Sequence, residues 1–168
     1  MPGGPAVTRH TMVAMGKASP ELYEADFYRW TVRNAELLRS GRLADADIAN
    51  IAQEIRDMGI SQRRELISRS SVLLRHLLKY EFSRPPLKAS AAKSWTATIR
   101  EQRRELARRL EQMPSLRHFL TKDLAKIYLE AAEDAVFEGR LDAKRLPGAC
   151  PYSVQQILDL EFLPRPRK

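Results

Sequence analysis

The sequence lacks several features that define large classes of protein. It contains one cysteine, Cys150, which excludes an internal disulfide framework and is typical of proteins from a reducing cytoplasm. No apolar run approaches the roughly 18 residues of a membrane-spanning helix, so we expect no membrane association. The first twenty residues have no apolar core of the kind found in a secretory signal, and we interpret residues 1–20 as a mobile arm.

Motifs for catalysis and metal binding are also missing. The three histidines, His10, His76 and His118, are not paired with cysteines at metal-ligand spacing, so neither a metal site nor a cofactor is indicated. There is no Gly-X-Ser-X-Gly sequence and no glycine-rich phosphate loop. Cys150 lies in a proline-containing connector and is a poor candidate nucleophile. The sequence therefore identifies no catalytic residue.

What is present is typical of one soluble globular domain. Apolar residues make up 43% and charged residues 30% of the 168 residues, and a chain of this length can bury a self-sufficient core. We expect a helical domain at residues 21–164, preceded by the mobile arm and followed by a mobile tail at residues 165–168.

The stretch Leu66–Phe82 is the strongest helical signal in the chain. Its leucines recur with the helical period and occupy a wide arc, which has to be covered on more than one side. We therefore predict an all-α fold, a single-domain helical bundle of about five to six helices with Leu66–Phe82 at its centre.

Glycines, prolines and capping residues predict where the other helices begin and end. Gly41, Gly59 and Gly139 are expected to end helices, and Pro85 and Pro86 to end the central one. Helices are expected to begin near Pro20, Asp45, Ser61, Trp95, Ser115 and Ser153. In the second of these, the spacing predicts a buried seam of Ile48, Ile51, Ile55 and Met58.

Positive charge is concentrated in the middle of the chain. Residues 61–113 contain thirteen basic and five acidic residues, a net +8 that equals the net charge of the whole chain. On the fourth helix Arg100, Arg104 and Arg108 recur every four residues, and Arg103 lies beside them. The planar guanidinium group suits bidentate binding of anions, so these arginines are candidate partner-binding residues. The alternative is a solvated mixed-charge face, because glutamates are interleaved with them.

A second group of polar residues borders the apolar arc. Glu65, Arg69 and His76 follow one edge of the central helix, with Lys79 nearby, while Glu54 and Trp95 come from neighbouring helices. One interpretation is a boundary network in which Glu65 pairs with Arg69 and His76 bonds a neighbouring helix. The other is a pocket between helices, with His76 as a general base and Lys79 or Arg69 holding an anion.

Several segments of the chain resemble, in order, those of a bacterial family catalogued as domain of unknown function 29. The matching segments are YEADFYRWTVRNAELLRSGR, IAQEIRDMG, LLRHLLKYEF, SWTATIREQRRELARRLEQMPSL and CPYSVQQILDLEFLP, which cover roughly residues 22 to 164. The resemblance implies an all-helical bacterial protein. It carries no catalytic residue with it, because the family has no assigned activity. The PPLKASAAK stretch departs from the pattern, and the N-terminal arm lies outside it.

Two functional hypotheses follow from these observations. The first is a non-enzymatic interaction module that presents its basic helix face to an acidic protein or nucleic acid. The second is an enzyme or small-ligand binder that uses an inter-helix pocket near His76. A homodimer formed through the fourth helix or Trp95 is a further possibility for the partner.

Overall fold

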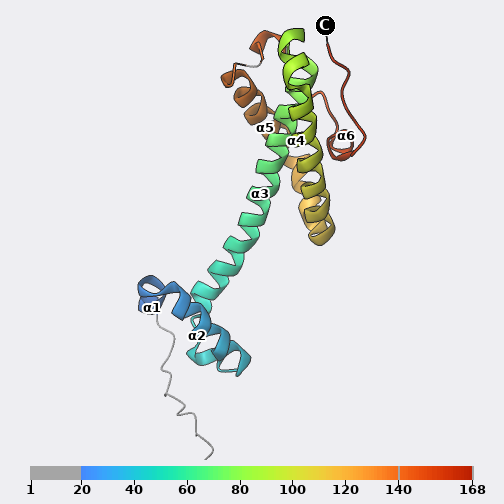
Figure 1. Cartoon of the computed structure of the whole chain (residues 1–168). Coiled ribbons are helices and arrows are strands. Elements are labelled where there is room, and N and C mark those ends of the chain that lie inside the picture. The colour runs from blue at the N-terminus through green and yellow to red at the C-terminus, as the bar shows by residue number, and fades with distance from the viewer. Residues whose placement is uncertain (1–19, 140, 168) are drawn as a thin grey trace, which may run out of the picture. The chain divides into compact units, whose positions relative to one another are not determined.

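The computed structural model describes residues 20–139 and 141–167, and within them there is no β-strand (Figure 1). The all-α prediction is confirmed, whereas the predicted mobile arm falls almost entirely on residues outside the described ones. The described residues form six α-helices: α1 (Pro20–Ala25), α2 (Phe27–Arg39), α3 (Ile48–Phe82), α4 (Pro85–Gln112), α5 (Arg117–Phe137) and α6 (Val154–Leu158).

The expected helical domain, residues 21–164, divides into two compact units. The first unit extends to Met58, and the second runs from Gly59 to the end of the chain. Helices α1 and α2 belong to the first unit together with the opening turns of α3. The second unit contains the rest of α3 and helices α4 to α6.

In the first unit, one aspartate separates α1 from α2 and another begins α3. Asp26 is the N-cap of α2, and its carboxylate accepts a hydrogen bond from the Arg29 N–H at 3.0 Å. Asp47, and not the predicted Asp45, accepts from the Asn50 N–H at the start of α3. Gly41 follows α2 with a φ of 71°, so it stops that helix as predicted.

Helix α3 passes through Gly59 without a break, so the prediction that one helix ends there and another begins near Ser61 was wrong. Glycine inside a helix costs only about 1 kcal/mol relative to alanine. A helix of 35 residues tolerates this cost, because leucines further along it are anchored in a core.

The predicted buried seam of the early part of α3 was also wrong. Ile48, Ile55 and Met58 are 50%, 64% and 67% exposed. The buried residue at this point is Asp47, directly before α3, whose carboxylate accepts a hydrogen bond from the Trp30 indole N–H of α2 at 3.1 Å. Apolar periodicity marks the face that a helix prefers to bury, and in this unit polar contacts decide which face is covered.

The core of the second unit forms around Leu66–Phe82, as predicted. The side chains of Leu66, Leu73, Leu74, Leu77 and Leu78 are fully buried. Around them pack apolar residues of α4, α5 and the chain's last forty residues, including Ile99, Leu106, Ile127, Tyr152 and Ile157. The broad leucine arc is therefore covered on several sides, which is what its width requires.

The two adjacent prolines end one helix and begin the next. Helix α3 stops at Phe82, and Pro85 and Pro86 occupy the first positions of α4. A first-turn N–H has no partner within its helix, so proline is tolerated there. Helix α4 consequently begins ten residues before Trp95, and the expectation that it begins near Trp95 was wrong. Ser115 likewise lies in a short 3-10 turn before α5 and does not cap it.

The last helix begins as its sequence predicts. Ser153 and Gln156 form a complete capping box at the N-terminus of α6. Leu158 at the end of α6 and Phe162 beyond it pack against the core. Among the residues that the structure describes, no helix combines the length and apolarity needed to cross a membrane.

Candidate functional site

Helix α4 and the segment that follows α6 together line a pocket of about 330 Å³. We call it the α4 pocket. Three of the four arginines predicted to bind a partner border it, and the chain after α6 supplies its opposite wall. Its lining residues are Thr96, Ile99, Arg100, Arg103, Arg104, Leu160, Glu161 and Leu163.

Arg103 forms the floor of the α4 pocket and has a structural role. Its side chain is only 1% exposed. The guanidinium donates hydrogen bonds to the carbonyl oxygens of Ile157 at 2.8 Å, Phe162 at 2.6 Å and Gln156 at 3.1 Å. Burial lowers the pKa of Arg103, and the charge of Asp159 opposes that effect. Arg103 therefore fixes the chain after α6 against α4.

The sequence contains a signal for the burial of Arg103. The apolar stripe of α4 runs through Ile99, Leu106 and Leu110, and position 103 lies on the same stripe, four residues after Ile99 and three before Leu106. Arg103 thus differs from Arg100, Arg104 and Arg108, which lie on the solvent side of α4. Helical spacing alone separates these two groups, although it does not reveal the carbonyl groups that Arg103 meets.

Arg100 and Arg104 lie one turn apart on α4, and both are exposed. Among the described residues, neither guanidinium group has a hydrogen-bond or ion-pair partner. Leu160 and Leu163 contribute apolar surface to the same pocket and are 53% and 39% exposed. Glu161 adds a carboxylate, so the pocket lining contains three cationic groups and one anionic group. This combination favours an anionic ligand that also has an apolar part.

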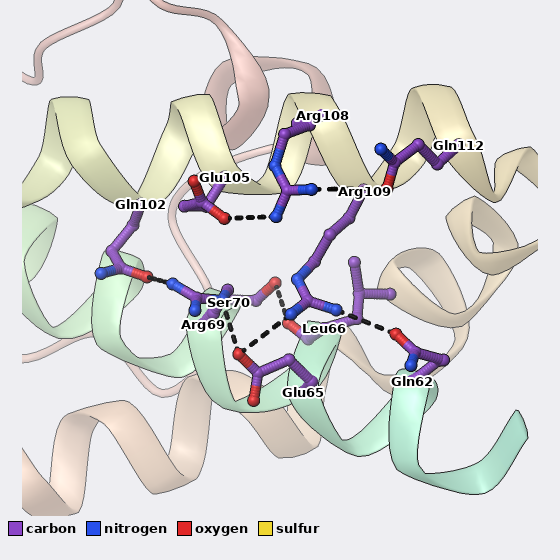
Figure 2. A network of polar contacts seen from close by, with 10 residues as sticks. All are labelled: Gln62, Glu65, Leu66, Arg69, Ser70, Gln102, Glu105, Arg108, Arg109 and Gln112. Carbon is purple, nitrogen blue, oxygen red and sulfur yellow. Dashed lines mark hydrogen bonds and ion pairs between the residues drawn. The ribbon is translucent and has the colours of Figure 1, made fainter. Parts of the chain in front are cut away.

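Arg108 differs from these two arginines because it is already paired. Its guanidinium donates to the Glu105 carboxylate at 2.9 Å and more weakly to Gln112 at 3.4 Å, as Figure 2 shows. The hydrogen bond from Arg108, followed by its charge, lowers the pKa of Glu105. The basic ridge predicted from spacing is therefore divided into an unpaired part at Arg100 and Arg104 and a paired part at Arg108.

The boundary network predicted for Glu65 and Arg69 is present between α3 and α4 (Figure 2). The Glu65 carboxylate accepts hydrogen bonds from Arg69 at 2.7 Å and from Arg109 at 3.3 Å. Arg69 also donates to Gln102 of α4 at 3.3 Å. Because each of these charges has a partner in the fold, the network accounts for the polar residues that the sequence places at this edge of α3.

His76 and Lys79 also have partners within the fold. His76 Nδ1 lies 2.8 Å from the Val72 carbonyl of its own helix, which can only accept, so Nδ1 carries the proton. The buried Lys79 ammonium pairs with Glu138, the residue that follows α5, and Arg75 also contacts this carboxylate at 3.3 Å. The cation that was expected to hold an anion near His76 is therefore bound to a carboxylate of the chain.

The remaining two members of the predicted pocket lie elsewhere. Glu54 belongs to the first unit, where its carboxylate accepts a hydrogen bond from the Tyr23 hydroxyl at 2.5 Å. This contact raises the pKa of Tyr23 to about 12. Trp95 is only 5% exposed in the core of the second unit. Both residues are therefore engaged in local packing.

The local environment of His76 predicts a loss of stability at mildly acidic pH. Burial, followed by the charges of Lys79 and Arg75, lowers the pKa of His76 below its ordinary value of about 6.5. Between the lowered pKa and about 6.5 the unfolded chain binds the proton more tightly, so stability falls as the pH is lowered through that window. We expect urea midpoints to decrease between about pH 7 and 5, and the His76→Gln variant to show a smaller decrease. An equal decrease in that variant would contradict the assignment.

The potential metal ligands of the described residues are dispersed, and the Cys150 thiol is half-buried. No group of three or more His, Cys, Asp or Glu residues there is placed to hold a metal ion. The Cys150 thiol contacts the Tyr152 carbonyl at 3.4 Å, and burial raises its pKa. A raised pKa reduces the thiolate fraction, which makes Cys150 a weak nucleophile.

The chain matches the family described as Domain of unknown function DUF29 over residues 22–163. This range covers both compact units and every residue of the α4 pocket. Searches among curated proteins and among solved structures find no match. The chain therefore belongs to the DUF29 family, as its sequence segments indicated.

Proposed function

We propose that this protein is a non-enzymatic interaction module that binds an acidic segment of a partner protein in the α4 pocket. The observation that carries the proposal is the pair Arg100 and Arg104, two exposed arginines that have no ion-pair partner among the described residues and border a pocket with apolar walls. An exposed guanidinium that is not committed within the fold can form bidentate bonds to a carboxylate.

An acidic protein suits this surface better than nucleic acid does. Binding to a nucleic-acid backbone uses many cationic side chains, since affinity rises with the number of phosphates neutralised. Of the four candidate partner-binding arginines, Arg103 is buried and Arg108 is paired with Glu105. The two that remain suit one or two acidic side chains, and Leu160 and Leu163 offer contacts to an apolar residue next to them.

The alternative function, an enzyme or small-ligand binder near His76, has less support. Its proposed anion-holding residues are both paired, Lys79 with Glu138 and Arg69 with Glu65. The His76 ring is bonded to the backbone of its own helix. That bond places the proton on Nδ1 and leaves Nε2 able to accept one, so the lower support for this function rests on the two paired cations.

Defined fluorescent peptides test the proposal directly. We expect a peptide of alternating glutamate and leucine to bind the full chain in fluorescence anisotropy, and a matched peptide with glutamine in place of glutamate to bind at least about tenfold more weakly. Reversing the two charges that are expected to contact the peptide should also weaken its binding. The Arg100→Glu/Arg104→Glu variant should weaken binding of the acidic peptide by at least about tenfold.

Arg108→Glu is the matched control, because it reverses a charge on the same helix that is already paired. It should change peptide affinity by less than about threefold. Equal weakening by Arg108→Glu would indicate general attraction to a basic surface and contradict a specific site. Tighter binding of single-stranded or duplex DNA, with a steep loss of affinity at high salt, would replace the acidic-protein proposal by the nucleic-acid one.

A further inference from the structure

A second pocket, of about 310 Å³, lies further along α4. We call it the Arg117 pocket, because Arg117, the first residue of α5, contributes its only cationic group. Leu158, the last residue of α6, forms part of its wall. The lining residues are Ala107, Leu110, Glu111, Arg117 and Leu158, and none of them lines the α4 pocket.

The two pockets follow the same face of α4. At about 100° per residue, the α4 residues of both linings fall within one arc of about 140°. Ala107 of the Arg117 pocket comes three residues after Arg104 of the α4 pocket, which is less than one helical turn. On the opposite wall, Leu158 and Leu160 are two residues apart. The pockets therefore lie in line between α4 and one segment of the chain.

The Arg117 pocket combines apolar walls with an uncommitted cation. Leu110 is only 8% exposed, and Ala107 and Leu158 add further apolar surface. Arg117 is exposed, and among the described residues its guanidinium has no hydrogen-bond or ion-pair partner. In this respect it matches Arg100 and Arg104 of the α4 pocket. The lining suits an apolar side chain that has a carboxylate beside it.

The separation of the pockets sets the size of a ligand that could use both. Arg100 and Leu110 are ten residues apart on α4, a rise of about 15 Å. About ten residues of helix or about five residues of extended chain reach across that distance. A single amino acid is too short, so a ligand that contacts both pockets is a segment of polypeptide.

Carboxylates in the two linings restrict the ligand further. Glu161 borders the α4 pocket and Glu111 borders the Arg117 pocket. Among the described residues, neither carboxylate has a hydrogen-bond or ion-pair partner. Both would repel a uniformly anionic chain such as a nucleic-acid strand. The arrangement favours a segment that has carboxylates near the arginines and apolar side chains between them.

We propose that one acidic segment of the partner protein occupies both pockets at once. Carboxylates at one end bind Arg100 and Arg104, an apolar side chain enters the Arg117 pocket, and a carboxylate at the other end binds Arg117. This inference rests on the proposed function, because it takes the α4 pocket as the first point of contact. Once one end is bound, the contact with Arg117 forms within the complex, so it strengthens binding without a separate partner.

Charge reversal at Arg117 tests the inference in fluorescence anisotropy with the full chain. The probe is a peptide of about twelve residues with alternating glutamate and leucine, which is long enough to span both pockets. Arg117→Glu should raise its dissociation constant by at least about tenfold. Lys122→Glu is the matched control, since it reverses an exposed cation of α5 that lines neither pocket. It should change the dissociation constant by less than about threefold.

A steric variant tests the same pocket without changing its charge. Ala107→Trp places a large side chain in the Arg117 pocket and should also weaken binding by at least about tenfold. Ala125→Trp, at an exposed position of α5 outside both linings, should have no such effect. Circular dichroism should show that all four variants are folded.

The outcomes separate this inference from the proposed function. If Arg100→Glu/Arg104→Glu weakens peptide binding but Arg117→Glu and Ala107→Trp do not, the α4 pocket alone binds the partner and the two-pocket inference is overturned. If Lys122→Glu weakens binding as much as Arg117→Glu does, the effect is general attraction, which also overturns it. A wild-type chain that does not bind the peptide would overturn both proposals.

Discussion

Replacing Arg103 by alanine is expected to lower the free energy of unfolding by about 3 kcal/mol, the largest effect of any single arginine on α4. The variant leaves three backbone carbonyls, those of Gln156, Ile157 and Phe162, without their donor. It also leaves a void where a fully buried side chain had been. Urea denaturation followed by circular dichroism measures the change.

Two comparison variants separate this role from the general effect of removing an arginine. Arg104→Ala removes an exposed neighbour and is expected to change stability by less than about 0.5 kcal/mol. Arg103→Lys keeps a positive charge but loses the planar fork, so we expect an intermediate loss. In Arg103→Ala, proteases should cleave the chain after α6 faster than in the wild type. Equal stability of Arg103→Ala and Arg104→Ala would refute the anchoring role.

The second large effect is expected at alkaline pH, at a contact between α3 and Tyr152, which lies two residues before α6. Tyr152 is 4% exposed, and its hydroxyl donates to the Glu81 carboxylate at 2.6 Å. Glu81 is also buried and additionally accepts from Arg167 at 2.7 Å. Burial, followed by the hydrogen bond and charge of Glu81, raises the pKa of Tyr152 well above its ordinary value of about 10.

The sign of the pH effect follows from this raised pKa. Above about pH 10 the unfolded chain loses the tyrosine proton while the folded chain keeps it, so stability falls as the pH rises, by up to about 1.4 kcal/mol per pH unit. Burial also raises the pKa of Tyr128, which acts in the same direction. Below about pH 10 the contribution of Tyr152 is fully present.

Urea midpoints at about pH 8, 10 and 11 test this expectation. The Tyr152→Phe variant should lose about 1 kcal/mol at pH 8, where the hydrogen bond to Glu81 is missing, and should show a shallower decline above pH 10. Tyr28→Phe, at a residue that is 78% exposed, is the control and should behave as the wild type does. A decline in Tyr152→Phe as steep as in the wild type would rule out Tyr152 as its source.

The contact between Glu81 and Arg167 was not anticipated from the sequence. Arg167 lies in the segment expected to be a mobile tail, yet it is bonded to Glu81 and its guanidinium lies 4.7 Å from the centre of the Phe82 ring. These residues are 86 positions apart, and no periodic pattern connects them. Their pairing depends on the path of the chain after α6, which local sequence preferences do not determine.

The candidate site was only partly predictable from the sequence, because one of its walls also comes from the chain after α6. The spacing of Arg100 and Arg104 placed both on the solvent side of α4, which is where they lie. The wall opposite them, formed by Leu160, Glu161 and Leu163, comes from about sixty residues further along the chain. Only the docking of this segment through Arg103 turns an exposed helix face into a pocket.

The sequence by itself determined the all-helical class, the central leucine arc at Leu66–Phe82 and the capping box that begins α6. These features depend on interactions within one or two helical turns and on apolar periodicity. Only the tertiary structure decided that α3 continues through Gly59, that Ile48, Ile55 and Met58 are exposed and that Arg103 is buried. The reason is physical: periodicity identifies an apolar face, whereas the partner that covers it is set by contacts between residues far apart in the chain.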